Sequence, residues 1–331
     1  MAATEKLLVV LLNYRTAEMT LRAADTALAD MPQGAELVIV DNASGDGSAE
    51  LLGRAVTDRG WDDRVRFIAS PVNGGFGAGN NIGIRAGLSD GGAPDYVYIL
   101  NSDAFVEPGC IAALMDHLRA HPEAGFAGSH VRGEDDVPHV TAFRFPSIAG
   151  EFEGGARIGA ISRVLRSAIV APPLPDTATQ VDWVAGASVL MRMDMLRDIG
   201  LFDETFFLYF EETDLCHRAA RAGWTGWYVP QARAVHIGSV STGMRGWQRM
   251  PSYWFDSRRH YFVKNHGRLY AGAALAARLA GGALHRLRCT LTGRPPQDPP
   301  HFLGDLLRHG TRRGTTAPRP SATRTVMEDR P

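Results

Sequence analysis

The sequence predicts an α/β fold, a mostly parallel, doubly wound sheet of Rossmann-like order followed by a C-terminal helical extension. Short apolar runs alternate with segments of helical apolar spacing throughout the N-terminal third of the chain. The expected strands are residues 7–12, 37–40, 65–68 and 96–100, and the expected helices are residues 16–29, 47–56 and 78–88. Such alternation is typical of parallel strands joined by right-handed helical crossovers.

Polar residues follow each of these expected strands. They are Asn13 and Tyr14, Asp41 and Asn42, residues 70–73, and residues 101–103. An open α/β sheet binds its ligand beyond the carboxyl ends of its strands, so these residues predict a binding site at that edge. The run from Tyr96 to Asp103 ends in an acid directly after a buried strand, which suits a metal or phosphate ligand. A plain Asx turn is the alternative interpretation of that run.

The segment from Asp41 to Ser48 has two equal interpretations, a turn that caps the next helix and a nucleotide-binding site, and both can hold for different residues. Asp41 could accept the imide N–H of a pyrimidine base, while Asp46 or Ser48 caps the following helix.

A glycine-dense segment, Asn73 to Gly83, leads into the third expected helix. Its glycines do not fit the dinucleotide fingerprint, because the last required glycine falls on Ile82 or on Asn80. A dehydrogenase is therefore excluded. A glycine-rich approach to a helix N-terminus still suits a nucleotide phosphate or ribose, with a flexible turn as the alternative.

The second half of the chain supplies acids and a histidine. Residues 128–182 look irregular, with connecting loops and a helical patch that could line the acceptor. Residues 183–191 predict a strand, and residues 211–222 predict a helix that starts with Glu211 and Glu212. Burial behind the aromatic run 206–210 would raise the pKa of such a carboxyl and make it a usable base. The alternative is that acids in the first turn favour the helix dipole and that Asp214 pairs with Arg218. His236 follows a short apolar stretch, a place where most histidines are structural.

Composition sets bounds on function. The 331 residues carry 35 Lys and Arg against 36 Asp and Glu, a net charge of −1, which gives no reason to expect nucleic acid as a partner. Cys110, Cys216 and Cys289 have no metal-site spacing and indicate a reducing compartment. The sequence shows no signal peptide, and its longest apolar stretch, 269–284, is too short to span a bilayer. A cytoplasmic protein is expected.

The expected organisation has a catalytic domain at 1–245, a basic amphipathic helical extension at 246–307 and a disordered tail at 308–331. Arginines precede and follow the apolar stretch 269–284 of the extension. Such a segment can lie on an anionic membrane surface. Packing on the catalytic domain or in a homodimer is an equal alternative.

Taken together and in order, these motifs resemble the family 2 glycosyltransferases, in particular their bacterial rhamnosyltransferase-like branch. The segments that carry the resemblance are Asn13-Tyr14, Asp41-Asn-Ala-Ser, Asn73 to Gly83, Leu100-Asn-Ser-Asp103, and the run from Gly200 to Asp214 with Arg218 and His236. The resemblance implies the glycosyltransferase A fold and inverting transfer of a sugar from a nucleoside diphosphate donor. It covers about three quarters of the chain, ending near residue 243.

The resemblance also implies roles for individual residues. Asp103 would hold Mg²⁺ or Mn²⁺ with His236, and Glu212 would be the base, with Glu211 as the alternative. Expected donor-binding residues are Asn13, Tyr14, Asp41, Asn42, Asn73, Gly75, Phe76, Asn80, Asn101 and Ser102. Expected acceptor-side or supporting residues are Trp183, Gly186, Asp214 and Arg218.

Two positions depart from the family pattern. Asn101 replaces the first acid of Asp-x-Asp, so a metal would keep more water ligands, and Glu212 replaces an Asp.

The expected reaction belongs to cell-surface polysaccharide assembly, with a saccharide or lipid-linked saccharide as acceptor. Resemblance to the branch favours dTDP-rhamnose as donor, ahead of UDP-sugars and GDP-sugars. Two alternatives stay open: a catalytically silent relative that binds a nucleotide sugar, and a sugar-1-phosphate nucleotidyltransferase. The second would need a glycine-rich loop after the first strand, where this chain has residues 13–16 without glycine.

Overall fold

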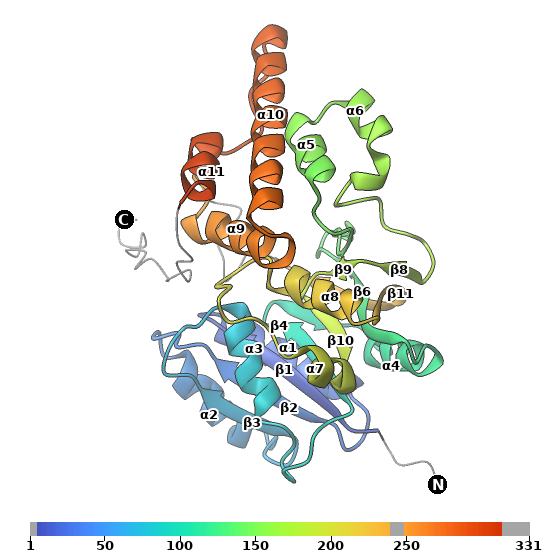
Figure 1. Ribbon diagram of the computed structural model, residues 1–331. Helices are drawn as coiled ribbons and strands as arrows, with labels where there is room; N and C mark the ends of the chain where they lie inside the picture. The colour runs from blue at the N-terminus through green and yellow to red at the C-terminus, as the bar shows by residue number, and fades with distance from the viewer. Residues whose placement is uncertain (1–4, 239–247, 313–331) are drawn as a thin grey trace.

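The computed structural model describes residues 5–238 and 248–312. Within them a nine-stranded sheet has the order β3-β2-β1-β4-β10-β6-β11-β5, with β8 paired to β11, and a separate ladder joins β7 to β9 (Figure 1). The strands are β1 Leu7–Asn13, β2 Glu36–Asp41, β3 Val65–Ala69, β4 Tyr96–Asn101, β5 Ala104–Val106, β6 Ala124–Arg132, β7 Ala142–Phe143, β8 Thr179–Val181, β9 Trp183–Val184, β10 Ser188–Arg192 and β11 Thr225–His236.

The helices cover both faces of the sheet and extend beyond it. They are α1 Ala17–Asp30, α2 Ser48–Asp58, α3 Phe76–Arg85, α4 Cys110–Ala120, α5 Ile148–Ala156, α6 Gly159–Val164, α7 Met193–Ile199, α8 Glu211–Arg221, α9 Ser252–His266, α10 Arg268–Thr292 and α11 Phe302–Gly310, with a 3₁₀ turn at Arg166–Ala168. None of these helices combines the length and hydrophobicity needed to cross a membrane.

The strands β3, β2, β1 and β4 are parallel, as the sequence predicts. Beyond β4 the sheet is mixed, because β10 runs antiparallel to both β4 and β6. Alternate residues of β1 face opposite layers. Leu7, Val9 and Leu11 pack with α1, α2 and α4, whereas Leu8 and Val10 pack with α3, α7 and α8.

Two predictions for the middle of the chain miss part of its structure. The segment 128–182 holds the expected helical patch as α5 and α6, but it also contains strands, since 128–132 complete the central strand β6 and β7 and β8 follow. Seven of the nine β6 residues are small or polar, a composition that masks a buried strand. The strand expected at 183–191 is divided into β9 and β10 by a break at 185–187.

The helices α5, α6, α9, α10 and α11 form a helical lobe beside the sheet (Figure 1). The axes of α5 and α10 come very close, because glycines line their crossing. A Cβ at Gly155 would lie 2.9 Å from the Arg278 carbonyl oxygen, and one at Gly281 would overlap the Phe152 carbonyl. The stretch 269–284 is thus largely a packing element of the lobe.

Only one of the two expected domain boundaries lies within the described residues. The boundary at 245/246 lies outside the described residues. The helix α11 ends at Gly310, so the tail expected to be disordered from 308 begins three residues too early. Residues 313–331 of that tail also lie outside the described part of the chain.

Candidate active site

The ends of β1 and β2 are joined by a buried polar network. Asn13 donates from Nδ2 to Asp41 Oδ1 at 2.7 Å and accepts from the Thr20 hydroxyl at 2.7 Å. Ser44 donates its hydroxyl to Asp41 Oδ1 at 2.5 Å and its backbone N–H to Asp41 Oδ2 at 3.0 Å. Asn13 and Asp41 are direct partners in the parallel register of the two strands, which brings them together.

The loop before α3 is held by side-chain amides and by an aromatic segment. Asn42 donates from Nδ2 to Asn73 Oδ1 at 3.0 Å and to the Gly75 carbonyl at 3.1 Å. The N–H of Phe76 donates to the Phe207 carbonyl at 3.0 Å. Gly75 has φ +89°, and a Cβ there would overlap that same carbonyl, so only glycine fits. The loop is therefore fixed against the aromatic run that precedes α8.

Neighbouring asparagines in α3 have different surroundings. Asn81 is saturated, because it donates to the Phe202 carbonyl and to Glu204 Oε1, both at 2.9 Å, and accepts from the Phe202 N–H at 3.1 Å. Asn80 is equally buried and donates to the Phe76 carbonyl at 3.0 Å, but its Oδ1 has no partner among the described residues. An unpaired buried acceptor is costly, so Asn80 is the asparagine suited to meet a ligand.

The end of β4 brings an acid and an imidazole together. His236, the last residue of β11, places Nε2 at 3.0 Å from Asp103 Oδ1 and at 3.4 Å from Asn101 Nδ2. Carboxylate, imidazole and amide oxygen are ligand types that Mn²⁺ accepts, while Mg²⁺ favours the oxygens. No cluster of three His, Cys, Asp or Glu forms a metal cage in residues 5–238 and 248–312. The residues thus fit a divalent cation that keeps several water ligands.

The break between β9 and β10 links this strand end to the acids of α8. The N–H of Asn101 donates to the Ala187 carbonyl at 3.0 Å, and the N–H of Gly186 donates to Glu212 Oε1 at 3.2 Å. A Cβ at Gly186 would lie 2.7 Å from Glu212 Oε1 and 2.8 Å from the ring of Phe76. Glycine at 186 therefore lets the Glu212 carboxylate and the glycine loop approach the same turn.

The acid pair at the start of α8 is buried at an energetic cost. Glu211 is 1% exposed, and its Oε2 has no partner in the described part of the chain. Burial and the neighbouring charge of Glu212 raise the pKa of Glu211 well above its usual range. Burial also raises the pKa of Glu212. Tyr209 and Phe210, just before the pair, both have φ +70°, an unusual conformation for bulky residues that is typical of functional sites.

Asp214 and Arg218 support the site from within. Asp214 is fully buried and accepts hydrogen bonds from Arg218 Nε at 2.9 Å, Lys264 Nζ at 2.8 Å and Asn265 Nδ2 at 2.9 Å. Arg218 also donates to the carbonyls of Ile199 and Leu201, at 2.6 and 2.7 Å. These bonds tie α8 to α9 and to the loop after α7, and they occupy the Asp214 carboxylate.

The remaining expected residues lie at the margins. Tyr14 is half-buried, with the Arg15 guanidinium 5.3 Å from the centre of its ring. Ser102 accepts from the Thr16 hydroxyl at 2.9 Å. Trp183 stacks on Phe143 with ring centroids 4.1 Å apart, so its position is set by the β7–β9 ladder.

Two contributors to the site carry little or no sequence signal. Ser44 completes the Asp41 network, and its place three residues after the acid, in an Asx-turn position, could have suggested it. Lys264 binds Asp214 from fifty residues away, and no local pattern predicts that contact.

Comparison with known families decides the identity. Residues 96–292 match the model described as "Glycosyl transferase family group 2", and residues 8–163 match "Glycosyl transferase family 2". The chain is a family 2 glycosyltransferase. This glycosyltransferase is 31% identical over 219 residues to the N-acetylglucosaminyl-diphospho-decaprenol L-rhamnosyltransferase of Mycobacterium tuberculosis (strain CDC 1551 / Oshkosh), covering 62% of this chain and 68% of that protein. It is 27% identical over 166 residues to rhamnosyltransferase WbbL of Escherichia coli (strain K12), covering 49% of this chain and 60% of WbbL.

Solved structures establish its fold class. The mannosyltransferase PcManGT of Pyrobaculum calidifontis, determined with GDP-Man and Mn²⁺, aligns with a TM-score of 0.57 at 16% identity, over 93% of this chain and 80% of PcManGT. GalNAc-T7, determined with UDP, GalNAc and Mn²⁺, also aligns with a TM-score of 0.57, at 14% identity, over 93% of this chain and 55% of its own. The glycosyltransferase therefore has the glycosyltransferase A fold, which confirms the predicted fold class.

Proposed function

We propose that this glycosyltransferase moves a sugar from a nucleoside diphosphate donor to a lipid-linked saccharide with inversion at the anomeric carbon. The observation that carries the proposal is the 185–187 break, whose Gly186 N–H binds Glu212 while its Ala187 carbonyl binds the Asn101 N–H. A candidate base and a candidate metal site are thereby attached to one short turn. An inverting displacement needs a base on the face opposite the leaving group.

The donor is assigned to the carboxyl edge of β1, β2 and β4. Asp41 Oδ2 accepts only the Ser44 N–H among the described residues, so it retains acceptor capacity for the N–H of a base. Asn80 Oδ1 is the buried acceptor for a hydroxyl of the donor. Relatives named as L-rhamnosyltransferases favour dTDP-rhamnose as the first donor to test.

Asp103 and His236, with the amide of Asn101, would hold the divalent cation. When bound, the cation neutralises the charge that develops on the departing diphosphate. Because Asn101 is neutral, the side chains of this site bring a single negative charge, that of Asp103. We therefore expect weak, exchangeable metal binding that the donor diphosphate strengthens.

Glu212 is assigned as the base that takes the acceptor hydroxyl proton. It is more exposed than Glu211 and accepts a hydrogen bond from a backbone N–H, so it ionises before Glu211, although burial raises its pKa as well. Glu211 is the deeper member, with its pKa raised well above the usual range by burial and by Glu212. In this arrangement Glu211 carries the proton and Glu212 carries the charge, while Asp214 and Arg218 hold α8 in place.

Two further expectations follow from relatives. The acceptor is assigned to the lipid-linked class because the mycobacterial relative is named for a diphospho-decaprenol substrate. The proposed transfer would then belong to polysaccharide assembly, at the cytoplasmic face of a membrane. Family membership removes the support for the nucleotidyltransferase alternative. The silent-relative alternative rests on the departures at Asn101 and Glu212.

The deciding experiment is thermal stabilisation by nucleotides and nucleotide sugars, with and without Mn²⁺, followed by a transfer assay with the best donor. Ligand binding to the native state raises its melting temperature. We expect a metal-dependent shift for dTDP and dTDP-rhamnose, and transfer to a polyprenyl-diphosphate-linked N-acetylglucosamine. Donor binding without transfer to any lipid-linked acceptor would favour the silent relative. If only UDP-sugars or only GDP-sugars stabilise the protein, the donor assignment changes from dTDP-rhamnose to a sugar of that class.

A further inference from the structure

Two segments of the helical lobe contain only positive charge. Residues 154–175 include Arg157, Arg163 and Arg166 and no Asp or Glu. Residues 257–297 include eight Lys and Arg and no Asp or Glu. The whole chain has a net charge of −1, so this positive charge is a local concentration. These two segments therefore concentrate positive charge within the lobe, which attracts an anionic partner.

The positive charges divide into paired and unpaired groups. Deep in the lobe, Arg258 pairs with Glu151 at 2.8 Å and Arg157 pairs with Asp298 at 2.7 Å. Further out, the arginines form no ion pair within residues 5–238 and 248–312. These are Arg163 in α6, Arg166 in the 3₁₀ turn that follows it, Arg286 and Arg288 in the last turns of α10, and Arg294 just after α10. Arg268 at the start of α10 and the buried Arg278 also form no ion pair among the described residues, but these five arginines are the group at the outer end of the lobe.

Apolar side chains are exposed among these arginines. Val164 in α6 is 80% exposed, and Leu287 and Leu291 in α10 are 57% and 77% exposed. Leu287 and Leu291 are four residues apart and share one face of the helix. The last turns of α10 rise past α5 and α6 on the side away from the sheet (Figure 1). Large exposed apolar residues within a basic surface are typical of helices that lie on anionic membranes.

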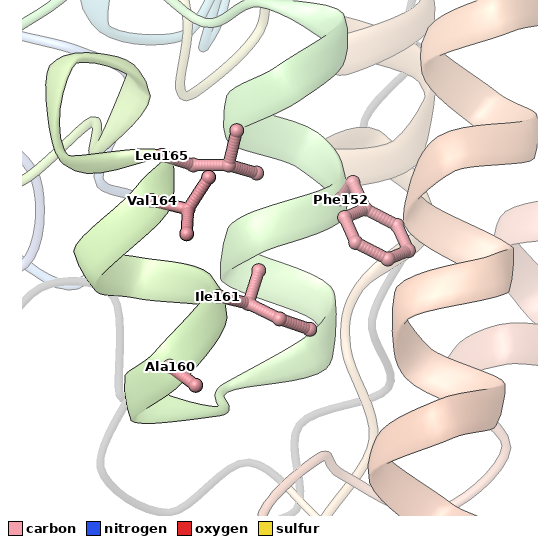
Figure 2. Close-up of a pocket in the computed structure, with 5 residues that line it drawn as sticks. All are labelled: Phe152, Ala160, Ile161, Val164 and Leu165. Carbon is pink, nitrogen blue, oxygen red and sulfur yellow. The ribbon is translucent and has the colours of Figure 1, made fainter.

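A hollow between α5 and α6 extends this apolar surface inward. It has a volume of about 430 Å³ and is lined by Phe152, Ala160, Ile161, Val164 and Leu165. Figure 2 shows Ala160, Ile161, Val164 and Leu165 on and just after α6, and Phe152 on α5. All five lining residues are apolar, and Val164 is also largely exposed to solvent. Apolar side chains of α6 therefore face both the hollow and the solvent.

We propose that α6 and the last turns of α10 form a docking surface for an anionic lipid bilayer. Arg163, Arg166, Arg286, Arg288 and Arg294 would meet lipid phosphates, and Val164, Leu287 and Leu291 would enter the boundary of the acyl chains. A second copy of the chain fits less well, because an isologous contact would bring the same unpaired arginines face to face. This docking surface is separate from the active site and does not depend on the donor or acceptor assigned to it.

The test uses the full chain and vesicle co-sedimentation at physiological salt. One set of vesicles is pure phosphatidylcholine, and the other contains phosphatidylglycerol in addition. We expect binding to the anionic vesicles only. Each basic residue near such a surface contributes about fivefold in affinity, so R163Q/R166Q/R288Q should weaken binding by about 100-fold. The matched control R22Q/R54Q/R59Q removes the same charge from exposed positions on α1, α2 and the residue after α2, and should bind like the wild type.

A second variant tests the apolar contribution. V164S/L291S changes only exposed side chains, so it should fold normally and lose vesicle binding at unchanged charge. Transfer to a water-soluble acceptor should be unaffected in both docking variants, which separates this test from failure of the proposed function. Equal binding to neutral vesicles, or equal loss of binding in the control, would overturn the proposal. So would a dimer in solution that L291S dissociates while wild-type vesicle binding is absent.

Discussion

The donor edge and the acidic edge of the active site differ in how their buried polar groups are satisfied. At the donor edge, Asn13, Asp41 and Ser44 donate and accept among themselves within a parallel strand register. At the acidic edge, Glu211 is almost fully buried with one carboxyl oxygen unpaired, and it follows two bulky residues with positive φ. The network of Asn13, Asp41 and Ser44 thus satisfies its own polar groups, whereas Glu211, like Asn80 on the donor side, keeps a buried oxygen unpaired among the described residues.

This difference shows which part of the active site lowers the stability of the fold. Strain and unpaired polar groups persist only where the surrounding structure enforces them, and they gather at sites that need a tuned group. Here the surrounding bonds come from Asp214, Arg218 and Lys264, which fix α8 from behind. Asn13, Asp41 and Ser44 are preorganised by their own hydrogen bonds, whereas the deep Glu211 beside the assigned base Glu212 is held at an energetic cost.

The largest expected effect is that of metal removal. Lewis-acid stabilisation of a departing diphosphate is worth several kcal/mol, so excess EDTA should lower the transfer rate by about 10³-fold. Re-addition of Mn²⁺ should restore the rate of the wild type. The rate of the D103N variant should stay low at the same Mn²⁺ concentrations. The measurement is initial rate against free Mn²⁺ concentration. Full activity in excess EDTA would remove the metal role of Asp103 and His236.

Replacement of the base is the next test. General base catalysis contributes about 10²–10⁴-fold, and we expect E212Q to lose kcat by that amount while nucleotide binding stays constant. E211Q should keep most of its activity, because Glu211 already carries a proton in our assignment. The wild-type kcat/KM should rise with pH through a pKa above that of an ordinary Glu, since burial raises the pKa of Glu212. A larger loss in E211Q than in E212Q would reverse the two roles.

Much of the donor edge could be predicted from the sequence, because its determinants are local. Apolar runs that end in polar residues define both the strands and the ligand edge, and the parallel register then brings Asn13 beside Asp41. The glycine-dense loop also carried its own signal, although its contact with the Phe207 carbonyl did not.

The acidic edge could be predicted only in part, since its determinants are distant in sequence. Glu211 and Glu212 are recognisable after an aromatic run, but the Gly186 turn lies inside what reads as one continuous strand. The Lys264 anchor and the close crossing of α5 with α10 join segments 50 and more than 100 residues apart. No local period encodes such contacts.

Two glycines with the same backbone conformation test the contact between the loop before α3 and the Phe207 carbonyl. Gly75 has φ +89° and ψ −173°, and Gly267 has φ +86° and ψ 168°, but a Cβ at Gly75 overlaps the Phe207 carbonyl, while one at Gly267 meets nothing within 4 Å. G267A should cost about 1 kcal/mol of unfolding free energy, the penalty of that backbone region alone. G75A should cost about 3 kcal/mol, because the loop must also move. Urea denaturation measures both, and equal costs would show that the contact with Phe207 contributes nothing.

The finest test replaces one buried acid on each edge by its amide. D41N puts an NH₂ group where Asp41 accepts several donors, so it should lower the unfolding free energy by about 2 kcal/mol. E211Q should be neutral at low pH and stabilising at high pH. The folded-state pKa of Glu211 is raised, so the folded protein retains a proton that the unfolded chain releases above about pH 4.3. Wild-type stability therefore falls as pH rises from that value toward the folded pKa, and E211Q removes the fall. Urea denaturation midpoints at acidic and alkaline pH measure this pH dependence of stability. If the midpoints of wild type and E211Q change equally with pH, Glu211 ionises in the folded protein like an ordinary glutamate.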